Sequence, residues 1–141
     1  MAFLRLIPFT FLFVACVQED PKPDSRAELF AGSDQYGKTW QITSIDVDFG
    51  TVTPNSCVTD NFITYYPNGN YEINEGATKC NPNDPPGEMG TWTLSNDESQ
   101  LTTTVGDSTQ VWVIDETLSD AHRITSTFSD VSLTYTLILS N

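Results

Sequence analysis

Positive charge is scarce in this sequence. Its 141 residues contain 6 Lys or Arg against 19 Asp or Glu, which gives a formal net charge of −13. Proteins that bind nucleic acids need clustered cations to displace the counterions of the phosphates, so this composition excludes a nucleic-acid binder. The length leaves room for one ordinary domain and little more.

Catalytic signatures are equally sparse. A Ser-His-Asp mechanism needs a base, for which His122 is the sole candidate, and the sequence has no Gly-x-Ser-x-Gly elbow. Carboxylates such as Asp46 with Asp48, or Glu72 with Glu75, are expected to keep the exterior soluble rather than to form an acid/base pair. We therefore expect no enzyme and no cofactor, and we expect His122 to be a half-exposed strand residue.

Long apolar runs are absent except at the amino terminus. Residues 1–15 carry one cation, Arg5, and then an apolar run from Leu6 to Ala15. This run has about half the length that a membrane-spanning helix needs. Its length, basic start and small final residue predict a secretory signal peptide over residues 1–15.

The end of that segment, Phe13-Val14-Ala15-Cys16, resembles the lipobox of bacterial lipoproteins. The resemblance implies cleavage before Cys16, acyl chains on the new terminus and a lipid anchor in the outer membrane. Several acyl chains anchor a protein stably, whereas a single chain binds only reversibly. Residues 16–24 would then be the lipidated terminus and a Pro-containing, extended tether. Its Glu19 and Asp20 resemble the surface-export signal of Bacteroidota lipoproteins. The alternative to a lipobox is an ordinary signal peptide followed by an incidental cysteine. The alternative to an export signal is a plain solvated tether.

The sequence has only three cysteines. Assigning Cys16 to lipid leaves Cys57 and Cys80, an even pair in an exported chain, for which we predict a disulfide. The chain-entropy contribution of this bridge would be about 3.5 kcal/mol. Two cysteines, a distant histidine and no Cys-x-x-Cys spacing do not make a tetrahedral metal site, so we expect no metal.

Residues 25–141 read as one all-β domain. From Gly37 onward, β-branched and aromatic residues recur in eight short runs separated by turn residues. Asn68-Gly69 is typical of a tight hairpin, and sequential hairpins build an antiparallel meander that closes as a barrel or folds as a two-sheet sandwich. The runs are Lys38 to Asp48, Thr59 to Tyr66, Asn70 to Asn74, Glu88 to Ser95, Ser99 to Val105, Thr109 to Asp115, His122 to Ser129, and Val131 to Ser140.

Alternation within these runs predicts the interior face. Trp40 and Ile42 are out of phase with Ile45 and Val47, so we expect a bulge near Thr43 or Ser44. The remaining expected interior pairs and series are Ile63 and Tyr65, Tyr71 and Ile73, Trp92 and Leu94, and Leu133, Tyr135, Leu137 and Leu139.

One short helix is expected before the strands. The stretch Asp24 to Ala31 has Asp24 or Ser25 as its cap and Gly32 as its stop. We predict that this helix forms a lid on one barrel mouth, with Leu29 and Phe30 turned inward.

The strand region carries a family resemblance. Gly37-Lys38-Thr39-Trp40-Gln41-Ile42, Thr64-Tyr65-Tyr66-Pro67-Asn68-Gly69-Asn70-Tyr71 and Gly90-Thr91-Trp92-Thr93-Leu94 are similar, in order and spacing, to motifs of the lipocalin-like domains of Bacteroidota lipoproteins. The resemblance implies an eight-stranded antiparallel up-and-down barrel with room for a ligand cavity, and it supplies no catalytic residues.

Two functions remain open at this point. In the first, the anchored barrel binds or carries a small apolar molecule in a cavity whose candidate lining residues are Trp40, Tyr65, Tyr71, Trp92 and Tyr135. In the second, these aromatic residues fill the barrel, and the loops Asp48 to Cys57 and Ile73 to Glu88 bind another macromolecule. The negative charge of the chain would favour a basic protein partner. Trp112 stands apart, because both faces of Val111-Trp112-Val113-Ile114 are apolar.

Overall fold

The computed structural model describes residues 25–48, 50–128 and 131–140. In this part of the chain, nine strands form one antiparallel sheet with two short helices, α1 (Arg26–Ala31) and α2 (Ser56–Thr59). The strands are β1 (Lys38–Val47), β2 (Gly50–Val52), β3 (Phe62–Tyr65), β4 (Asn70–Asn74), β5 (Gly87–Leu94), β6 (Gln100–Val105), β7 (Ser108–Thr117), β8 (Ala121–Phe128) and β9 (Val131–Leu139).

The sheet closes into a barrel because its first long strand also pairs with its last. From β3 to β9 each strand pairs with the next, β3 pairs with the first half of β1, and β9 pairs with β1 on the other side. These eight strands are the expected up-and-down barrel, so the sandwich alternative is wrong. The ninth strand, β2, lies outside the barrel and pairs with the second half of β1, from Ile45 to Val47.

Side-chain alternation fixes the register as the sequence predicts. Ile63 faces Ile73 and Tyr65 faces Tyr71 across β3 and β4, and the Asn68-Gly69 turn between them has the positive φ of 85° at Gly69. The pairing of β1 with β9 shifts between Ile42 and Ser44, which confirms the predicted bulge. A second shift, between Ile114 and Glu116 of β7, is not predicted by the sequence pattern.

The region between β1 and β3 differs from the sequence prediction. The expected loop from Asp48 to Cys57 contains β2 and the start of α2, and the expected strand from Thr59 begins only at Phe62. Because β1 leaves β3 after Gln41, the seam between these two strands opens beyond that residue. Helix α2 lies beside this seam, where the side-chain amide of Gln41 donates to the carbonyl of Thr59 at 2.5 Å.

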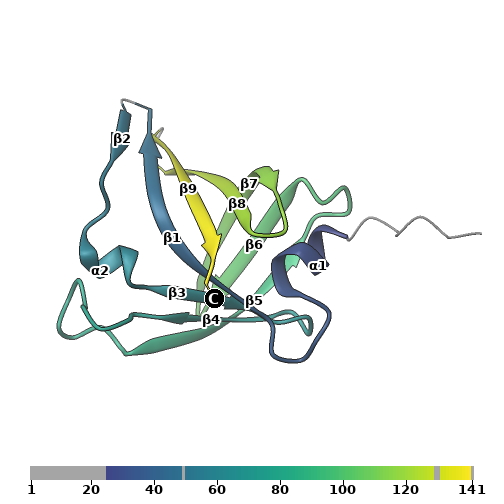
Figure 1. Cartoon of the computed structure of the whole chain (residues 1–141), viewed down its shortest axis with the longest axis horizontal. Coiled ribbons are helices and arrows are strands. Elements are labelled where there is room, and N and C mark those ends of the chain that lie inside the picture. The colour runs from purple at the N-terminus through teal and green to yellow at the C-terminus, as the bar shows by residue number, and fades with distance from the viewer. Residues whose placement is uncertain (1–24, 49, 129–130, 141) are drawn as a thin grey trace, which may run out of the picture.

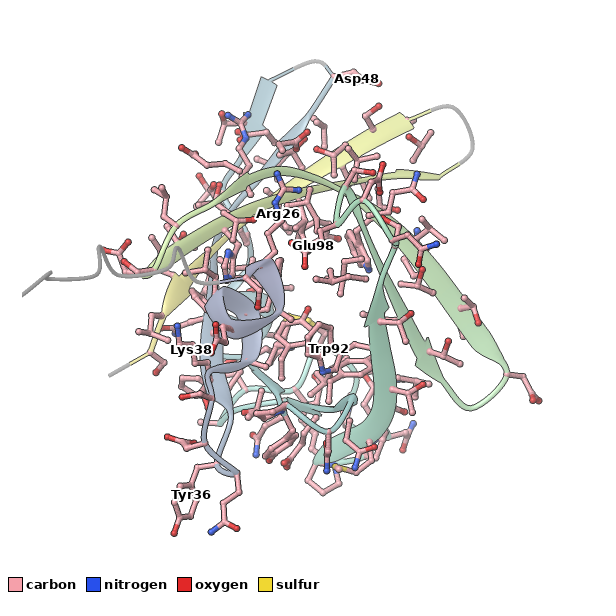
Figure 2. All side chains as sticks on the ribbon, turned by 90° about the vertical axis from the view of Figure 1, so that its right-hand side faces the viewer. Arg26, Tyr36, Lys38, Asp48, Trp92 and Glu98 are labelled. Atoms are coloured by element: carbon pink, nitrogen blue, oxygen red, sulfur yellow. A yellow bond between two sulfur atoms is a disulfide. The ribbon has the colours of Figure 1, made fainter. Side chains whose placement is uncertain are left out.

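Helix α1 covers one end of the barrel, as predicted, and α2 lies at the other end (Figure 1). Ser25 caps α1 in a capping box with Glu28, and Gly32 ends it with a φ of 72°. Phe30 is fully buried, whereas Leu29 is only half-buried. Figure 2 looks onto this end and shows α1 lying across the barrel opening, with Trp92 close to it.

The turn between β5 and β6 holds α1 in place. The guanidinium of Arg26 donates to the carbonyl of Glu98, and the backbone N–H of Arg26 donates to the Glu98 carboxylate at 3.3 Å. The turn itself is organised by Asp97, whose carboxylate accepts hydrogen bonds from Ser95 and Ser99, and these bonds lower the pKa of Asp97 to about 2. The helix is therefore fixed to the barrel by polar contacts as well as by burial.

A cluster of aromatic rings, here called the aromatic floor, lies where α1 packs on the barrel. Phe30 of α1 forms it together with the strand residues Trp40, Tyr65, Trp92 and His122. Apolar residues of the strands continue this core toward the other end, and the whole cluster lies between Ala27 and Leu139. The segment from Ser25 onward thus contains a complete hydrophobic core, and we expect it to fold as an independent domain.

Candidate functional site

The barrel interior is hollow on the far side of the aromatic floor. A cavity of about 260 Å³ lies there, lined mainly by aliphatic and aromatic side chains. Its lining residues come from seven of the strands, from the segment before β3 and from the residue that follows β4, and they are Ile42, Asn61, Ile63, Tyr65, Tyr71, Ile73, Glu75, Thr103, Trp112, Ile124, Tyr135 and Leu137. Buried rings close the end of the barrel that α1 covers. The site is therefore a pocket that opens at the other end, beside α2.

A second hollow of about 410 Å³ adjoins the cavity along β4 to β7. It shares Tyr71, Ile73, Thr103 and Trp112 with the cavity and adds Glu88 and other residues of the open end. The two hollows therefore share a wall formed by β4, β6 and β7.

One wall of the cavity is a fixed pair of aromatic rings. Trp112 and Tyr135 meet edge to face, with ring centroids 5.2 Å apart and an interplanar angle of 89°. The indole N–H of Trp112 donates to the hydroxyl of Thr103 at 3.1 Å, and Thr103 is itself buried. This bond holds the indole in one orientation, so the wall is organised before any ligand arrives.

The tyrosines of the cavity are neutral phenols. Burial raises the pKa of Tyr65 and the pKa of Tyr135 above the ordinary value, and burial together with the Glu88 carboxylate raises the pKa of Tyr71. Removal of water from a phenol disfavours its charged form. The interior therefore offers a ligand apolar surface and hydroxyl groups, not phenolate charge.

Hydrogen bonds between side chains and backbone groups beside α2 stabilise the rim of the cavity. The carboxylate of Asp60 accepts hydrogen bonds from the N–H groups of Ala77, at 3.1 Å, and Thr78, at 2.8 Å. In the orientation that satisfies its neighbours, the amide of Asn61 donates to the carbonyl of Glu75 at 2.9 Å. These hydrogen bonds thus link the segment before β3, which carries Asn61, to the segment after β4, which carries Glu75.

The predicted disulfide lies in this rim. Cys57 and Cys80 are bonded, with their Cα atoms 5.0 Å apart. The bond joins α2 to the long connection between β4 and β5, close to the contacts of Asp60. Covalent and hydrogen-bonded links therefore fix the same two segments at the cavity mouth.

The structure divides the five candidate lining residues into two groups. Tyr65, Tyr71 and Tyr135 line the cavity. Trp40 and Trp92 lie instead in the aromatic floor, where their indole N–H groups donate to the carbonyls of Phe30, at 2.8 Å, and Tyr66, at 2.9 Å. The candidate lipidation residue Cys16 lies outside the described residues.

Several lining residues were not among the sequence candidates. Trp112 and Thr103 face the cavity because each shares strand parity with a buried residue, Ile114 and Leu101 respectively. That parity is a signal that the sequence contains. Asn61 and Glu75, in contrast, reach the cavity through the rim contacts, which no periodic pattern reveals.

His122 is buried, so the expectation of a half-exposed residue is wrong. Only 1% of its surface is accessible, and neither ring nitrogen has a hydrogen-bond partner. Its ring lies between those of Phe30 and Trp40, with both centroid separations at 3.9 Å. Burial, reinforced by the Lys38 ammonium and partly opposed by the Leu29 carbonyl, lowers the pKa of His122 to about 4.

Fold and site together define a closed antiparallel β-barrel with an internal apolar pocket. No protein-family profile matches the chain, and a comparison with curated proteins finds no similar sequence. Among the residues that the structure describes, no helix is both long and apolar enough to cross a membrane, and no group of three His, Cys, Asp or Glu side chains is placed to hold a metal ion.

Proposed function

We propose that this protein is a lipocalin-like lipoprotein, anchored in the outer membrane through Cys16, whose barrel binds or carries a small apolar molecule. The observation that carries the binding proposal is the cavity of about 260 Å³, closed at one end by the aromatic floor and lined by isoleucine, leucine and aromatic side chains. Pockets for small molecules have this combination of apolar lining and few polar groups.

The size of the barrel supports a binding function over a filled scaffold. An eight-stranded barrel is just wide enough to be filled by side chains or to hold one small ligand. In this barrel, side chains fill the end that α1 covers, where Trp40 and Phe30 are fully buried. At the α2 end, the cavity remains although large aromatic side chains line it. These side chains therefore do not fill the barrel interior.

The lipid anchor is supported by the lipobox resemblance and agrees with where α1 lies. The tether of residues 16–24 leads directly to Ser25, which begins the helix at the closed end of the barrel. An anchor at Cys16 would thus join the domain at its closed end and not at the cavity mouth. Metabolic labelling with a radioactive fatty acid tests this part of the proposal, because Cys16→Ser should abolish the label.

Native mass spectrometry of the domain from Ser25 to Asn141 tests the binding function. The domain is purified gently from its host and sprayed without denaturant. We expect a retained small-molecule adduct that disappears when Ile63→Trp fills the cavity. The control is Val113→Trp, which adds the same ring to a half-exposed position on the outer face of β7.

A clean apo mass, together with failure to take up apolar probes, would reject the binding proposal. The acidic loops around α2 and the disulfide would then be the place to look for a basic protein partner. This second function would be favoured by retention of such a partner on the wild-type domain and its loss when the Cys57–Cys80 bond is removed.

A further inference from the structure

Among the described residues, the charged side chains that line the cavity and the adjoining hollow are both acidic. Glu75 lines the cavity, and Glu88 lines the hollow that adjoins it. Both side chains are carboxylates. A ligand that enters the barrel therefore passes between carboxylates.

Cationic side chains are absent from the cavity lining in the part of the chain that the structure describes. Each of the four described cations is engaged elsewhere: Arg26 on the Glu98 carbonyl, Lys38 on the Leu29 carbonyl at 3.1 Å, Lys79 on the Asp84 carbonyl at 2.6 Å, and Arg123 on the Asp46 carboxylate at 3.9 Å. The buried His122 is neutral at pH 7, because its pKa is lowered to about 4. None of these four cations is among the residues that line the cavity or the adjoining hollow.

This distribution discriminates between ligands with the same apolar body. A carboxylate head at the mouth would lose water, meet like charges and find no cationic partner, which is an unfavourable combination. An ammonium head would meet the half-buried Glu75, where opposite charges attract more strongly than in water, and the exposed Glu88 at the outer edge. The mouth is thus complementary to a cation.

The aromatic wall adds a second attraction of the same sign. A cation over the face of a tryptophan or tyrosine ring is stabilised by the negative electrostatic potential of that face. Trp112 is fixed by its bond to Thr103, and Tyr135 meets it edge to face, so the two rings present differently oriented surfaces to the cavity. Tyr71 lines both hollows beside them.

We infer that the cavity takes a cationic amphiphile, an organic amine whose apolar body lies among the isoleucines of the barrel and whose ammonium group lies at the rim near Glu75. This inference rests on the proposed binding function and names its ligand class. The apolar body contacts Ile63, Ile73 and Ile124, and the head remains close to the acidic mouth.

Three probes with the same alkyl chain test the inference: octylamine, octanol and octanoate. Binding to the domain from Ser25 to Asn141 is measured by calorimetry and by the change in tryptophan fluorescence at low ionic strength. We expect octylamine to bind tightest and octanoate weakest, with about a tenfold difference in Kd between the two. The preference should shrink as salt is added, because salt screens charges at the mouth.

Two variants locate the source of the preference. Glu75→Gln should weaken octylamine several-fold and octanol much less, whereas Glu116→Gln, which removes the same charge from an exposed position of β7, should change neither. Trp112→Leu keeps an apolar side chain but removes the ring, so it should also weaken octylamine more than octanol. Thermal unfolding of each variant verifies that the domain remains folded.

Each outcome bears on one proposal or on both. Equal binding of the three probes would overturn the amine inference and leave the binding function standing. Equal effects of Glu75→Gln and Glu116→Gln would also overturn it, because the attraction would then come from the net charge of the domain rather than from the mouth. If none of the probes binds at any concentration below aggregation, the inference and the proposed function both fail.

Discussion

The imidazole of His122 lies flat against the phenyl ring of Phe30, with centroids 3.9 Å apart and an interplanar angle of 15°. The contact joins the start of β8 to the helix that covers the barrel end. It also places a titratable ring where water does not reach, since both of its nitrogens are buried without hydrogen-bond partners. The stacking of these two rings therefore couples the attachment of α1 to the protonation of His122.

Stability should fall as the pH is lowered from about 6.5 to about 4. The pKa of His122 is depressed to about 4 in the folded protein, so within this window the unfolded chain binds more protons than the folded one. The loss is at most about 3 kcal/mol, because one pKa unit corresponds to about 1.4 kcal/mol.

Chemical denaturation across this pH range, with His122→Phe as the comparison, isolates the contribution of the histidine. The variant keeps a ring between Phe30 and Trp40 but does not titrate, and it shares every carboxylate with the wild type. Its free energy of unfolding should decline less between pH 6.5 and pH 4. Parallel pH profiles for the two proteins would contradict the prediction.

Phe30→Ala should lower the free energy of unfolding by about 3 to 5 kcal/mol, the usual cost of emptying a buried aromatic site. Phe30 is fully buried and contacts the rings of Tyr65, Trp92 and His122. Tyr36→Ala is the matched control, because Tyr36 is 76% exposed on the segment that follows α1. Urea unfolding compares the two variants, and similar losses would show that α1 does not close the barrel end through Phe30.

Gly90→Ala should disturb the cavity as well as the stability. A Cβ at this position would collide with the carbonyl oxygen of Thr104 and with the ring of Tyr71. Overpacking of this kind costs about 1 to 3 kcal/mol, and relief by displacement of Tyr71 would narrow the cavity.

The control for this substitution is Thr91→Ala on the exposed face of the same strand. Thermal unfolding and uptake of octanol are measured for both variants. Normal octanol binding in a destabilised Gly90→Ala protein would show that Tyr71 does not shape the site.

Removal of the disulfide should act on the rim before it acts on the barrel. Cys57→Ser together with Cys80→Ser should lower stability by about 3 to 4 kcal/mol, the entropy of a loop of this size. Hydrogen exchange should increase first at Ala77 and Thr78, whose N–H groups bond to Asp60 at the mouth. Faster exchange spread evenly over the strands, with Ala77 and Thr78 unchanged relative to them, would contradict a local role.

Much of the barrel follows from alternation alone. The phase break between Ile42 and Ile45 locates the bulge of β1, and Asn68-Gly69 locates the β3–β4 turn. Each of these signals is local, because a bulge or a tight hairpin depends on a few neighbouring residues. The predicted boundaries of β4 agree with those of the structure for the same reason.

The parts that the sequence does not reveal depend on contacts between distant segments. Strand β2 exists because β1 extends beyond its pairing with β3 and offers a free edge, and α2 is held beside that seam by Gln41 and the disulfide. The burial of His122 is not expected from its polar residue type, although its parity with the buried Ile124 places it inside. Trp40 and Trp92 fit the interior pattern, but the pattern does not say at which end of the barrel the space remains.

The attachment of α1 has a mechanical consequence for a chain anchored as proposed. Any force transmitted along the tether reaches Ser25 and then a helix of six residues, before it reaches a strand. That helix is retained by the burial of Phe30, by the contact of Arg26 with Glu98 and by two hydrogen bonds, from Lys38 to the Leu29 carbonyl and from Trp40 to the Phe30 carbonyl. Tension would be borne first by these contacts, and pulling α1 away would expose His122 to water while the nine-stranded sheet and the cavity mouth stayed intact.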